Sequence, residues 1–418
     1  MTTKSNERSA LDRTTGGRNL PKSQRGVRLL LTAVALAGCL VVLAGCGGSG
    51  TSTTQTGSAQ YLLTKMVSDT VGGGGAIVDP DLTNPWGVAF SPAGPFWIAD
   101  NASGKSTLYD SNGVKQGLIV NLPTPTASTG GAVTGQVYNG TNSFLVNGSP
   151  ALFIFSTEDG TIVAWTANSG ANAVLKVDNS QVVYNLPGGN VTGAVYKGLA
   201  IGNNNQGNFL FATNFRSGKI DVFDTNFAAA NLAGSFTDPS GIPAGFAPFG
   251  IQNINGVLYV TYARQDAAKQ DDVAGPGNGL IDVFDTNGAF MKRLVTGSAA
   301  GGTVATLNSP WGLALAPAGF GKFSSDLLVG NFGDGHINAF HPTTGALLGT
   351  LLNSTNSPIV IPGLWGLIFG NGGQGGSANS LFFTAGIGDP PTFTANVETH
   401  GLFGKLQSTG TSTTASVR

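Results

Sequence analysis

Apolar and polar positions alternate in short runs along most of the chain. Runs of about five apolar or β-branched residues are separated by clusters of Gly, Asn, Asp and Pro, and apolar spacing of the helical kind is scarce. Short runs bounded by turn-forming residues are typical of β-strands. The pattern therefore predicts an all-β protein built from many short strands.

These runs recur as units of three. Each unit has a first run that contains a small residue, a strongly apolar second run and a third run that often ends in Asp. The six second runs are FWIADN (Phe96–Asn101), ALFIFS (Ala151–Ser156), FLFATN (Phe209–Asn214), VLYVTY (Val257–Tyr262), DLLVGN (Asp326–Asn331) and SLFFTA (Ser380–Ala385). The first runs share the glycines Gly87, Gly135, Gly198, Gly250, Gly312 and Gly366, which are 48 to 63 residues apart. Repeats of this length with several strands each indicate the blades of a β-propeller.

The fold class we expect is an all-β, six-bladed β-propeller over residues 61–407. The run YLLTKMVSD (Tyr61–Asp69) precedes the first unit and has no partner of its own, while the sixth unit ends after its third run. Pairing this N-terminal strand with the last blade would hide two strand edges that otherwise promote aggregation. We therefore expect the strand to close the ring.

The repeat resembles NHL-type six-bladed propellers. The resemblance rests on NPWGVAFSPAGPFWIADN, which begins at Asn84, and on GLIDVFDTNG, and it covers about residues 84–406. More narrowly, the chain is similar to an uncharacterised family of exported bacterial propellers, on the stretches NPWG, QDAAKQDDVAGPGNG, GNFGDGHINAF and ETHGLFG. Blade 2 lacks the Pro-aromatic-Gly start and blade 6 carries the insertion GIGDPPTFTANV, so the resemblance defines their boundaries less sharply.

The first 45 residues have the character of a bacterial signal peptide. A basic segment precedes an apolar run that ends in LAGC, with the cysteine at position 46. This order of segments is typical of secretory signals, and LAGC resembles the lipobox whose cysteine is lipidated. We favour Cys46 over Cys39, where the same four letters would leave too short an apolar run; a plain signal or an anchor is the alternative. Residues 46–60 then form a flexible tether and residues 408–418 a disordered tail.

The charge balance changes once this leader is set aside. Seven of the 21 basic residues but only two of the 22 acidic residues lie in the first 45 positions, so the remainder carries a net charge of about −6. A mildly acidic chain without a basic patch argues against nucleic-acid binding. Both cysteines lie at or before position 46, which leaves no disulfide or cysteine nucleophile in the propeller.

The candidate site lies on the face where loops precede each first run and follow each second run. Long loops in blades 4 and 6 open there, and insertions of this length are where function concentrates. We expect Glu158 and Asp159 of blade 2 to lie on the same face. The candidate ligand-binding residues are Asn101, Asn214, Arg264, Asp266, Asp271, Asp272, Asn331, Glu398 and His400.

Each of these residues also has a purely structural interpretation. Asparagine after a strand commonly forms a turn, the blade 4 acidic residues fit a solvated loop as well as a ligand site, and His400 fits a structural hydrogen bond. Carboxylates and amide carbonyls around a funnel also suit Ca²⁺ or another divalent cation, with Asp271, Asp272 and Asp389 as weak candidate ligands. Trp86, Phe249, Trp311 and Trp365 occupy equivalent positions, and we expect them to pack between blades.

Fold alone does not define activity. Because the sequence offers no unambiguous catalytic set, we expect a monomeric, non-catalytic binding or scaffolding lipoprotein, exported and anchored in the membrane of the bacterial cell envelope. Its partner would be a small molecule, a glycan or an envelope protein. The alternative is a metal-assisted lactonase, another hydrolase or a lyase with its site in the funnel.

Overall fold

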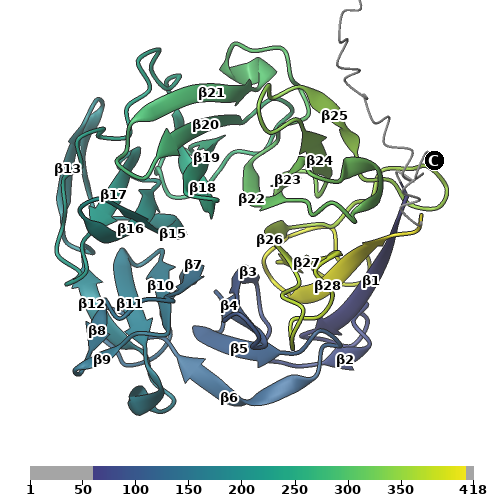
Figure 1. Cartoon of the computed structure of the whole chain (residues 1–418), viewed down its shortest axis with the longest axis horizontal. Helices are drawn as coiled ribbons and strands as arrows, with labels where there is room; N and C mark the ends of the chain where they lie inside the picture. Colours follow the sequence, from purple (N-terminus) through teal and green to yellow (C-terminus); the bar gives the residue numbers. More distant parts are fainter. Residues whose placement is uncertain (1–59, 411–418) are drawn as a thin grey trace, which may run out of the picture. The chain divides into compact units, whose positions relative to one another are not determined.

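Six sheets, antiparallel except for one parallel pair of strands in the last, follow one another around a central axis in the computed structural model, which describes residues 60–410 (Figure 1). Blade 1 contains β3 (Pro85–Ala89), β4 (Phe96–Asp100), β5 (Lys105–Tyr109) and β6 (Lys115–Asn121); blade 2 contains β7 (Val133–Tyr138), β10 (Phe153–Thr157), β11 (Thr161–Trp165) and β12 (Val174–Asp178); blade 3 contains β15 (Tyr196–Asn204), β16 (Gly207–Asn214) and β17 (Lys219–Phe223). Blade 4 contains β18 (Phe246–Ile254), β19 (Val257–Arg264), β20 (Leu280–Asp285) and β21 (Phe290–Thr296); blade 5 contains β22 (Pro310–Leu315), β23 (Leu327–Asn331), β24 (Ile337–Phe340) and β25 (Leu347–Thr350); blade 6 contains β26 (Leu364–Phe369), β27 (Ser380–Ala385), β28 (Leu402–Ser408), β1 (Tyr61–Ser68) and β2 (Ile77–Val78). The predicted all-β, six-bladed propeller is confirmed.

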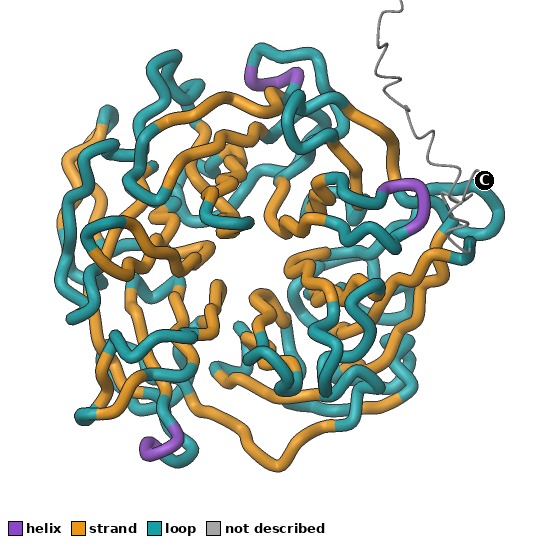
Figure 2. Tube along the Cα trace, in the orientation of Figure 1, coloured by secondary structure: helices purple, strands orange, loops and turns teal. Residues whose placement is uncertain are grey.

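Little else is regular in the described residues. Two small hairpins stand apart from the blades, β8 (Leu145–Val146) with β9 (Ser149–Pro150) and β13 (Val183–Leu186) with β14 (Gly189–Thr192). The helical segments of residues 60–410 are three single 3₁₀ turns, η1 (Ala167–Ser169), η2 (Ser298–Ala300) and η3 (Gly321–Phe323) (Figure 2). Within the same residues, no helix has the length and apolar character needed to cross a membrane. The signal, the tether up to residue 59, Cys39 and Cys46, and the tail from residue 411 lie outside the described residues.

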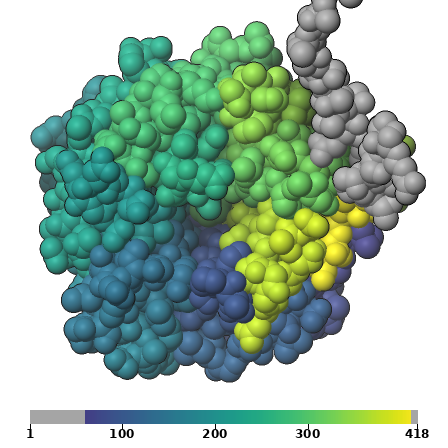
Figure 3. All heavy atoms as spheres, viewed as in Figure 1, coloured from purple at the N-terminus to yellow at the C-terminus, as the bar shows by residue number. Residues whose placement is uncertain are grey.

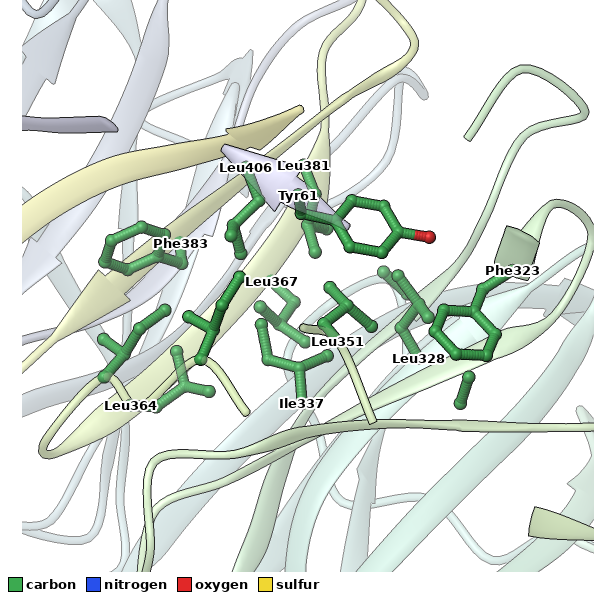
Figure 4. Close-up of a cluster of buried hydrophobic side chains, with 14 of the residues drawn as sticks. Tyr61, Phe323, Leu328, Ile337, Leu351, Leu364, Leu367, Leu381, Phe383 and Leu406 are labelled. Atoms are coloured by element: carbon green, nitrogen blue, oxygen red, sulfur yellow. The ribbon is translucent and has the colours of Figure 1, made fainter. Parts of the chain in front are cut away.

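The N-terminal strand closes the ring as predicted. β1 pairs antiparallel with β28, from Tyr61 opposite Ser408 to Ser68 opposite Leu402. The last blade in chain order therefore lies beside the first, as the yellow and purple residues show (Figure 3). The Tyr61 ring is buried among the leucine, isoleucine and phenylalanine side chains of blades 5 and 6 (Figure 4), and its hydroxyl donates to the backbone oxygen of Phe320 at 3.0 Å. β1 thus completes both a sheet and a hydrophobic cluster.

The six recurring glycines lie where neighbouring inner strands come closest. A Cβ atom on Gly250 would lie 2.1 Å from the backbone oxygen of Trp311, and one on Gly312 would lie 2.4 Å from that of Trp365. A Cβ atom on Gly87, Gly135, Gly198 or Gly366 would lie similarly close to a backbone atom of the next blade. These positions favour glycine because the backbones approach too closely for a side chain. The period found in the sequence therefore reflects the packing of blade against blade.

Candidate functional site

Each inner strand carries an irregularity at its glycine. The antiparallel register shifts in all six pairs of first and second strands, at Pro85–Val88 in blade 1 and at corresponding places in the other blades. A β-bulge of this kind redirects a side chain out of the regular alternation. The residue before each glycine is redirected in this way. These six residues are Trp86, Thr134, Lys197, Phe249, Trp311 and Trp365, and all but Thr134 and Lys197 are aromatic.

The aromatic members of this set form one cluster with Phe215 and Phe332, in which Trp311 and Phe332 are half-buried and the other rings are buried. The rings of Trp86 and Trp365 are stacked with centroids 3.5 Å apart, and Trp311 meets both edge-on at 6.1 and 5.8 Å. These residues come from blades 1, 5 and 6, so the contacts join blades that surround the axis. They pack against one another as well as between adjacent blades. We call Trp86, Phe215, Phe249, Trp311, Phe332 and Trp365 the aromatic floor.

Blade 3 places Lys197 in this ring of aromatic positions. The side chain is almost fully buried, with its Nζ 5.0 Å from the centre of the Trp86 ring. The ammonium forms ion pairs with Glu158 of blade 2 and with Asp271 of blade 4, the latter at 3.0 Å. Burial by itself lowers the pKa of Lys197, but the two carboxylates outweigh burial and raise it above its usual value. The lysine therefore stays charged, which makes it unsuitable as a nucleophile.

Two further carboxyl groups approach the lysine. Burial raises the pKa of Asp272 to about 6, against the opposing effects of Ser309 and the Lys197 charge. Burial and then the nearby Glu158 charge raise the pKa of Glu398, from the blade 6 loop, to about 7. Residues of the blade 4 and blade 6 loops thus lie near enough to Lys197 to interact with its charge. We call Glu158, Lys197, Asp271, Asp272 and Glu398 the axial cluster.

Hydrogen bonds extend the axial cluster toward blades 1 and 6. The indole of Trp365 donates to the Asn84 side chain at 3.3 Å, Asn84 donates to Asn101 at 3.3 Å, and Asn101 donates to Glu158 at 3.0 Å. Asn84 and Glu398 have positive φ angles of 47° and 77°. Backbone strain of this kind in non-glycine residues is concentrated at functional sites.

Polar atoms at the cluster are left without partners among the described residues. The Trp86 indole Nε1 is enclosed and donates no hydrogen bond there, and the Asp272 carboxylate oxygen and the Ser309 hydroxyl, which approach each other, form no hydrogen bond with any third group. Buried polar groups in this condition are uncommon and call for an explanation such as a bound ligand or water. The aromatic floor and the unpaired atoms therefore mark this place as the candidate site.

Several of the sequence-predicted residues are engaged elsewhere. Asn214 and Asn331 are fully buried and hold turns or neighbouring loops of their own blades, so they do not offer amides to the axis. The strand register explains this difference from Asn101. Asn331 lies opposite Pro310 in blade 5, whereas the residue opposite the equivalent Pro85 in blade 1 is Asp100. Asn101 therefore lies one position further along its strand than Asn331 does. The three asparagines are therefore not structurally equivalent.

The remaining candidates also have local roles or lie at the surface. Asp266 accepts backbone N–H groups of its own loop, and Arg264 is exposed at the end of β19. His400 pairs with Asp69 at 2.9 Å, beside the closing strand. Asp389 is half-buried and accepts a hydrogen bond from Asn396 at 2.8 Å. Within residues 60–410, no group of three or more His, Asp or Glu side chains is arranged to hold a metal ion.

Lys197 is the functional candidate that the sequence analysis missed. A signal for it was present, because aligning the six glycines places a lysine where four other blades have Trp or Phe. A charged residue at an otherwise apolar, buried position needs partners of opposite charge. Those partners come from loops 39 and 74 residues away, which the alignment by itself does not bring together.

No family model matches the chain. The chain is 33% identical over 322 residues to the uncharacterised protein R648 of Acanthamoeba polyphaga mimivirus, across 75% of this chain and 74% of that protein. It is 34% identical over 300 residues to the uncharacterised protein L690 of the same virus, across 69% and 74% of the two chains. The chain belongs to the family of these mimivirus proteins.

Similar solved structures include other propellers. Virginiamycin B lyase from Staphylococcus aureus is 16% identical, with 83% of this chain and 99% of that chain covered and a TM-score of 0.42. A chain of the nidogen–laminin complex is 14% identical, with 68% and 84% covered and a TM-score of 0.41.

Proposed function

We propose that the chain is a binding module that holds a small organic cation at the axial cluster. The observation that carries this proposal is the charge imbalance around Lys197: carboxylates of blades 2 and 4 pair with its ammonium group, and two further carboxyl groups, of blades 4 and 6, are near enough to interact with its charge. Two of these carboxyl groups have raised pKa values, so the cluster relieves part of the imbalance by holding protons. A cationic ligand would replace those protons.

The aromatic floor supports the same class of ligand. The Lys197 ammonium already lies over the Trp86 ring, and aromatic faces attract cations, most strongly when water is excluded. An amine or guanidinium group on a small molecule, or on a side chain of an envelope protein, would be attracted by both the aromatic rings and the carboxylates. This chemistry favours such a partner over a neutral glycan.

Calorimetry on the purified propeller tests the site directly. We expect at least one amine from a panel of primary amines, polyamines and quaternary ammonium compounds to bind, with Ca²⁺ run as a separate arm. The double substitution Asp271→Asn, Asp272→Asn should weaken that binding more than tenfold, because charge-assisted contacts contribute about 1.5–3 kcal/mol each. Affinity should also rise as pH increases through about 7, where Glu398 ionises.

A matched control has the same loss of charge at other positions. Asp178→Asn combined with Asp389→Asn changes two carboxylates outside the axial cluster, and this variant should bind normally. Unchanged affinity in the Asp271, Asp272 variant, or an equal loss in the control, would contradict the proposed site.

We also propose that this module is exported and held at the cell envelope by a lipid on Cys46. The lipobox and the Gly/Ser-rich segment behind it support this placement. Mass spectrometry of the membrane fraction should find the lipid on Cys46 and lose it in Cys46→Ala but not in Cys39→Ala. A lipid-modified Cys46→Ala protein would show that the assignment is wrong.

A hydrolase or lyase, metal-assisted or not, is the second candidate, and the raised pKa of Glu398 favours it. A carboxyl group with a pKa of about 7 serves as a general acid or base at neutral pH. Turnover of a lactone or ester panel that is lost in Glu398→Gln, with metal content measured in the same preparation, would support the enzyme. Binding without turnover supports the module.

A further inference from the structure

Blade 3 differs from the other blades described in residues 60–410 because its sheet ends at the third strand. The order is β15-β16-β17, so one side of β17 faces no further strand. Within those residues, the backbone bonds to this side are confined to its C-terminal end, where Ala230 donates to the Val222 oxygen at 2.8 Å and Asp224 donates to Ala228. Because strand residues alternate in direction, the N–H groups of Ile220 and Val222 and the Ile220 oxygen face outward unpaired.

A cavity of about 700 Å³ lies along this open edge. All five residues of β17 line it, between the hairpin that contains Tyr184 and the segment that contains Leu232 and Phe236. Tyr262 of blade 4 is buried except for its contact with the cavity, and its hydroxyl has no hydrogen-bond partner within residues 60–410. In Figure 1 the hairpin strand β13 lies outside β17 at the rim of the blade. The cavity therefore occupies the place of a fourth strand.

Blade 4 shows what fills this place when the strand is present. Residues Ile220–Asn226 and Ile281–Asn287 have the same sequence, IDVFDTN. In blade 4 the strand β21 pairs antiparallel with this segment and places Arg293 opposite Asp282. The Arg293 Nε donates to the Asp282 carboxylate at 2.5 Å, so the fourth strand neutralises the buried aspartate of the third.

The equivalent aspartate of blade 3 has no such partner. Asp221 lines the cavity and accepts hydrogen bonds from the Tyr196 hydroxyl and the Asn214 amide, both at 2.9 Å. Burial raises the pKa of Asp221, against the effects of these two bonds and of Lys219. The same IDVF edge thus presents a carboxyl group that lacks the basic residue found in blade 4.

We propose that the β17 edge binds an extended peptide segment, which adds to blade 3 as its fourth strand and places a basic side chain opposite Asp221. The unpaired N–H and C=O groups of β17 supply the backbone bonds, as in other cases of strand addition. The walls of the cavity take the apolar side chains on either side of the basic residue. Because the edge is bounded by the hairpin and by the 229–242 segment, it suits a single extended chain better than the edge of another folded sheet.

The probe is a fluorescein-labelled peptide of sequence AFMKRLVT, which is residues 289–296 of this chain. Fluorescence anisotropy with the whole propeller should show saturable binding, and replacing the peptide arginine with glutamine should weaken it about tenfold or more. Asp221→Asn in the protein should remove that preference for arginine, because the two changes disrupt the same pair. A scrambled peptide of the same composition is the control for non-specific association.

Hydrogen exchange reports the binding mode independently of any substitution. Peptide addition should slow exchange of the Ile220 and Val222 amides more than tenfold, while the amides of β25 in blade 5 remain unchanged. Ile220→Pro removes one outward N–H without breaking the pairing with β16, and it should weaken binding with the melting temperature checked in parallel. The proposal would be overturned if no saturable binding were found or if the scrambled peptide bound equally well. It would also be overturned if, without peptide, protection of the Ile220 and Val222 amides from exchange increased with protein concentration.

Discussion

Blades 3 and 4 have the same seven residues, IDVFDTN, in the third strand and the turn after it, but the blade 3 sheet has three strands and the blade 4 sheet has four. In both, an aspartate at the end of the third strand caps a tight turn: Asp224 accepts the N–H groups of residues 226 and 228, and Asp285 accepts those of residues 287 and 289. The fourth turn residue has a positive φ in each, 62° for Phe227 and 77° for Gly288. The turn itself therefore does not decide whether a fourth strand forms.

The residues after the turn make the difference. Blade 4 continues with FMKRLVT, whose aromatic and β-branched residues favour a strand, whereas blade 3 continues with AANLAGS, whose Ala, Asn and Gly do not. The blade 3 segment instead bonds to the blade 4 turn, through Gly234 to Asn287 and Phe236 to Gly288. Phe236 packs on Phe284 there, with ring centroids 5.4 Å apart. One sheet is therefore left open while the contact between blades is strengthened.

Blade 6 offers a third arrangement, because it borrows its outer strand from the N-terminus. Deleting residues 60–69 should produce insoluble protein, since the change exposes the β28 edge and removes Tyr61 and Val67 from two buried clusters. Blade 3 tolerates an open edge because the hairpin and the 229–242 segment enclose it. The measurement is soluble yield and thermal unfolding.

Deletion of residues 47–59 alone is the control, and it should leave solubility unchanged. A soluble protein with an unchanged melting temperature after loss of residues 60–69 would show that closure contributes little.

Arg293→Gln should lower the free energy of unfolding by about 3 kcal/mol or more. It leaves the fully buried carboxylates of Asp282 and Asp238 without their cation, and breaking a buried pair on one side is strongly destabilising. Asp221→Asn in blade 3 should cost less, about 1 kcal/mol, because no ion pair is lost. Urea denaturation of both variants checks the difference, and equal losses would contradict the distinction drawn between the two blades.

Grafting the blade 4 strand into blade 3 should close the open edge. Replacing residues 229–235 with FMKRLVT should protect the Ile220 and Val222 amides, abolish binding of the AFMKRLVT peptide and raise the free energy of unfolding by about 1 kcal/mol. The measurements are hydrogen exchange, anisotropy and urea denaturation.

A graft with glutamine in place of the arginine is the matched control, and it should gain less stability. If the grafted protein still binds the peptide at full affinity, the cavity is not the place of a missing strand.

The smallest expected effect is the pH dependence that Asp221 contributes. Because burial raises its pKa in the folded protein, its stabilising contribution is present below the unfolded pKa of about 4 and is lost as pH rises through the folded pKa. Asp221→Asn should remove that decline, which amounts to about 1 kcal/mol or less. Affinity for the arginine peptide should change in the opposite direction and increase with pH, because the pair needs an ionised Asp221.

The sequence by itself determined the six blades, the order of three strands in each and the closing role of residues 61–69. Strand periodicity and turn residues are local, and the glycines of the inner strands recur because each inner strand meets its neighbour backbone to backbone. It also marked the loops of Asp271, Asp272 and Glu398 as one face of the molecule. The strands and turns follow from short stretches of chain, and the repeat of those stretches defines the blades.

Only the tertiary structure decided which of those loops lie together and which partner each buried charged side chain has. Lys197 became a candidate site residue because it pairs with Glu158 and Asp271, which lie on other blades. The strand register, and not the residue type, determines that Asn214 and Asn331 lie away from the axial cluster. The identical IDVFDTN segments of blades 3 and 4 are the sharpest case. Their own residues are the same, so whether Asp221 or Asp282 gains an arginine is determined by a contact with another segment of the chain.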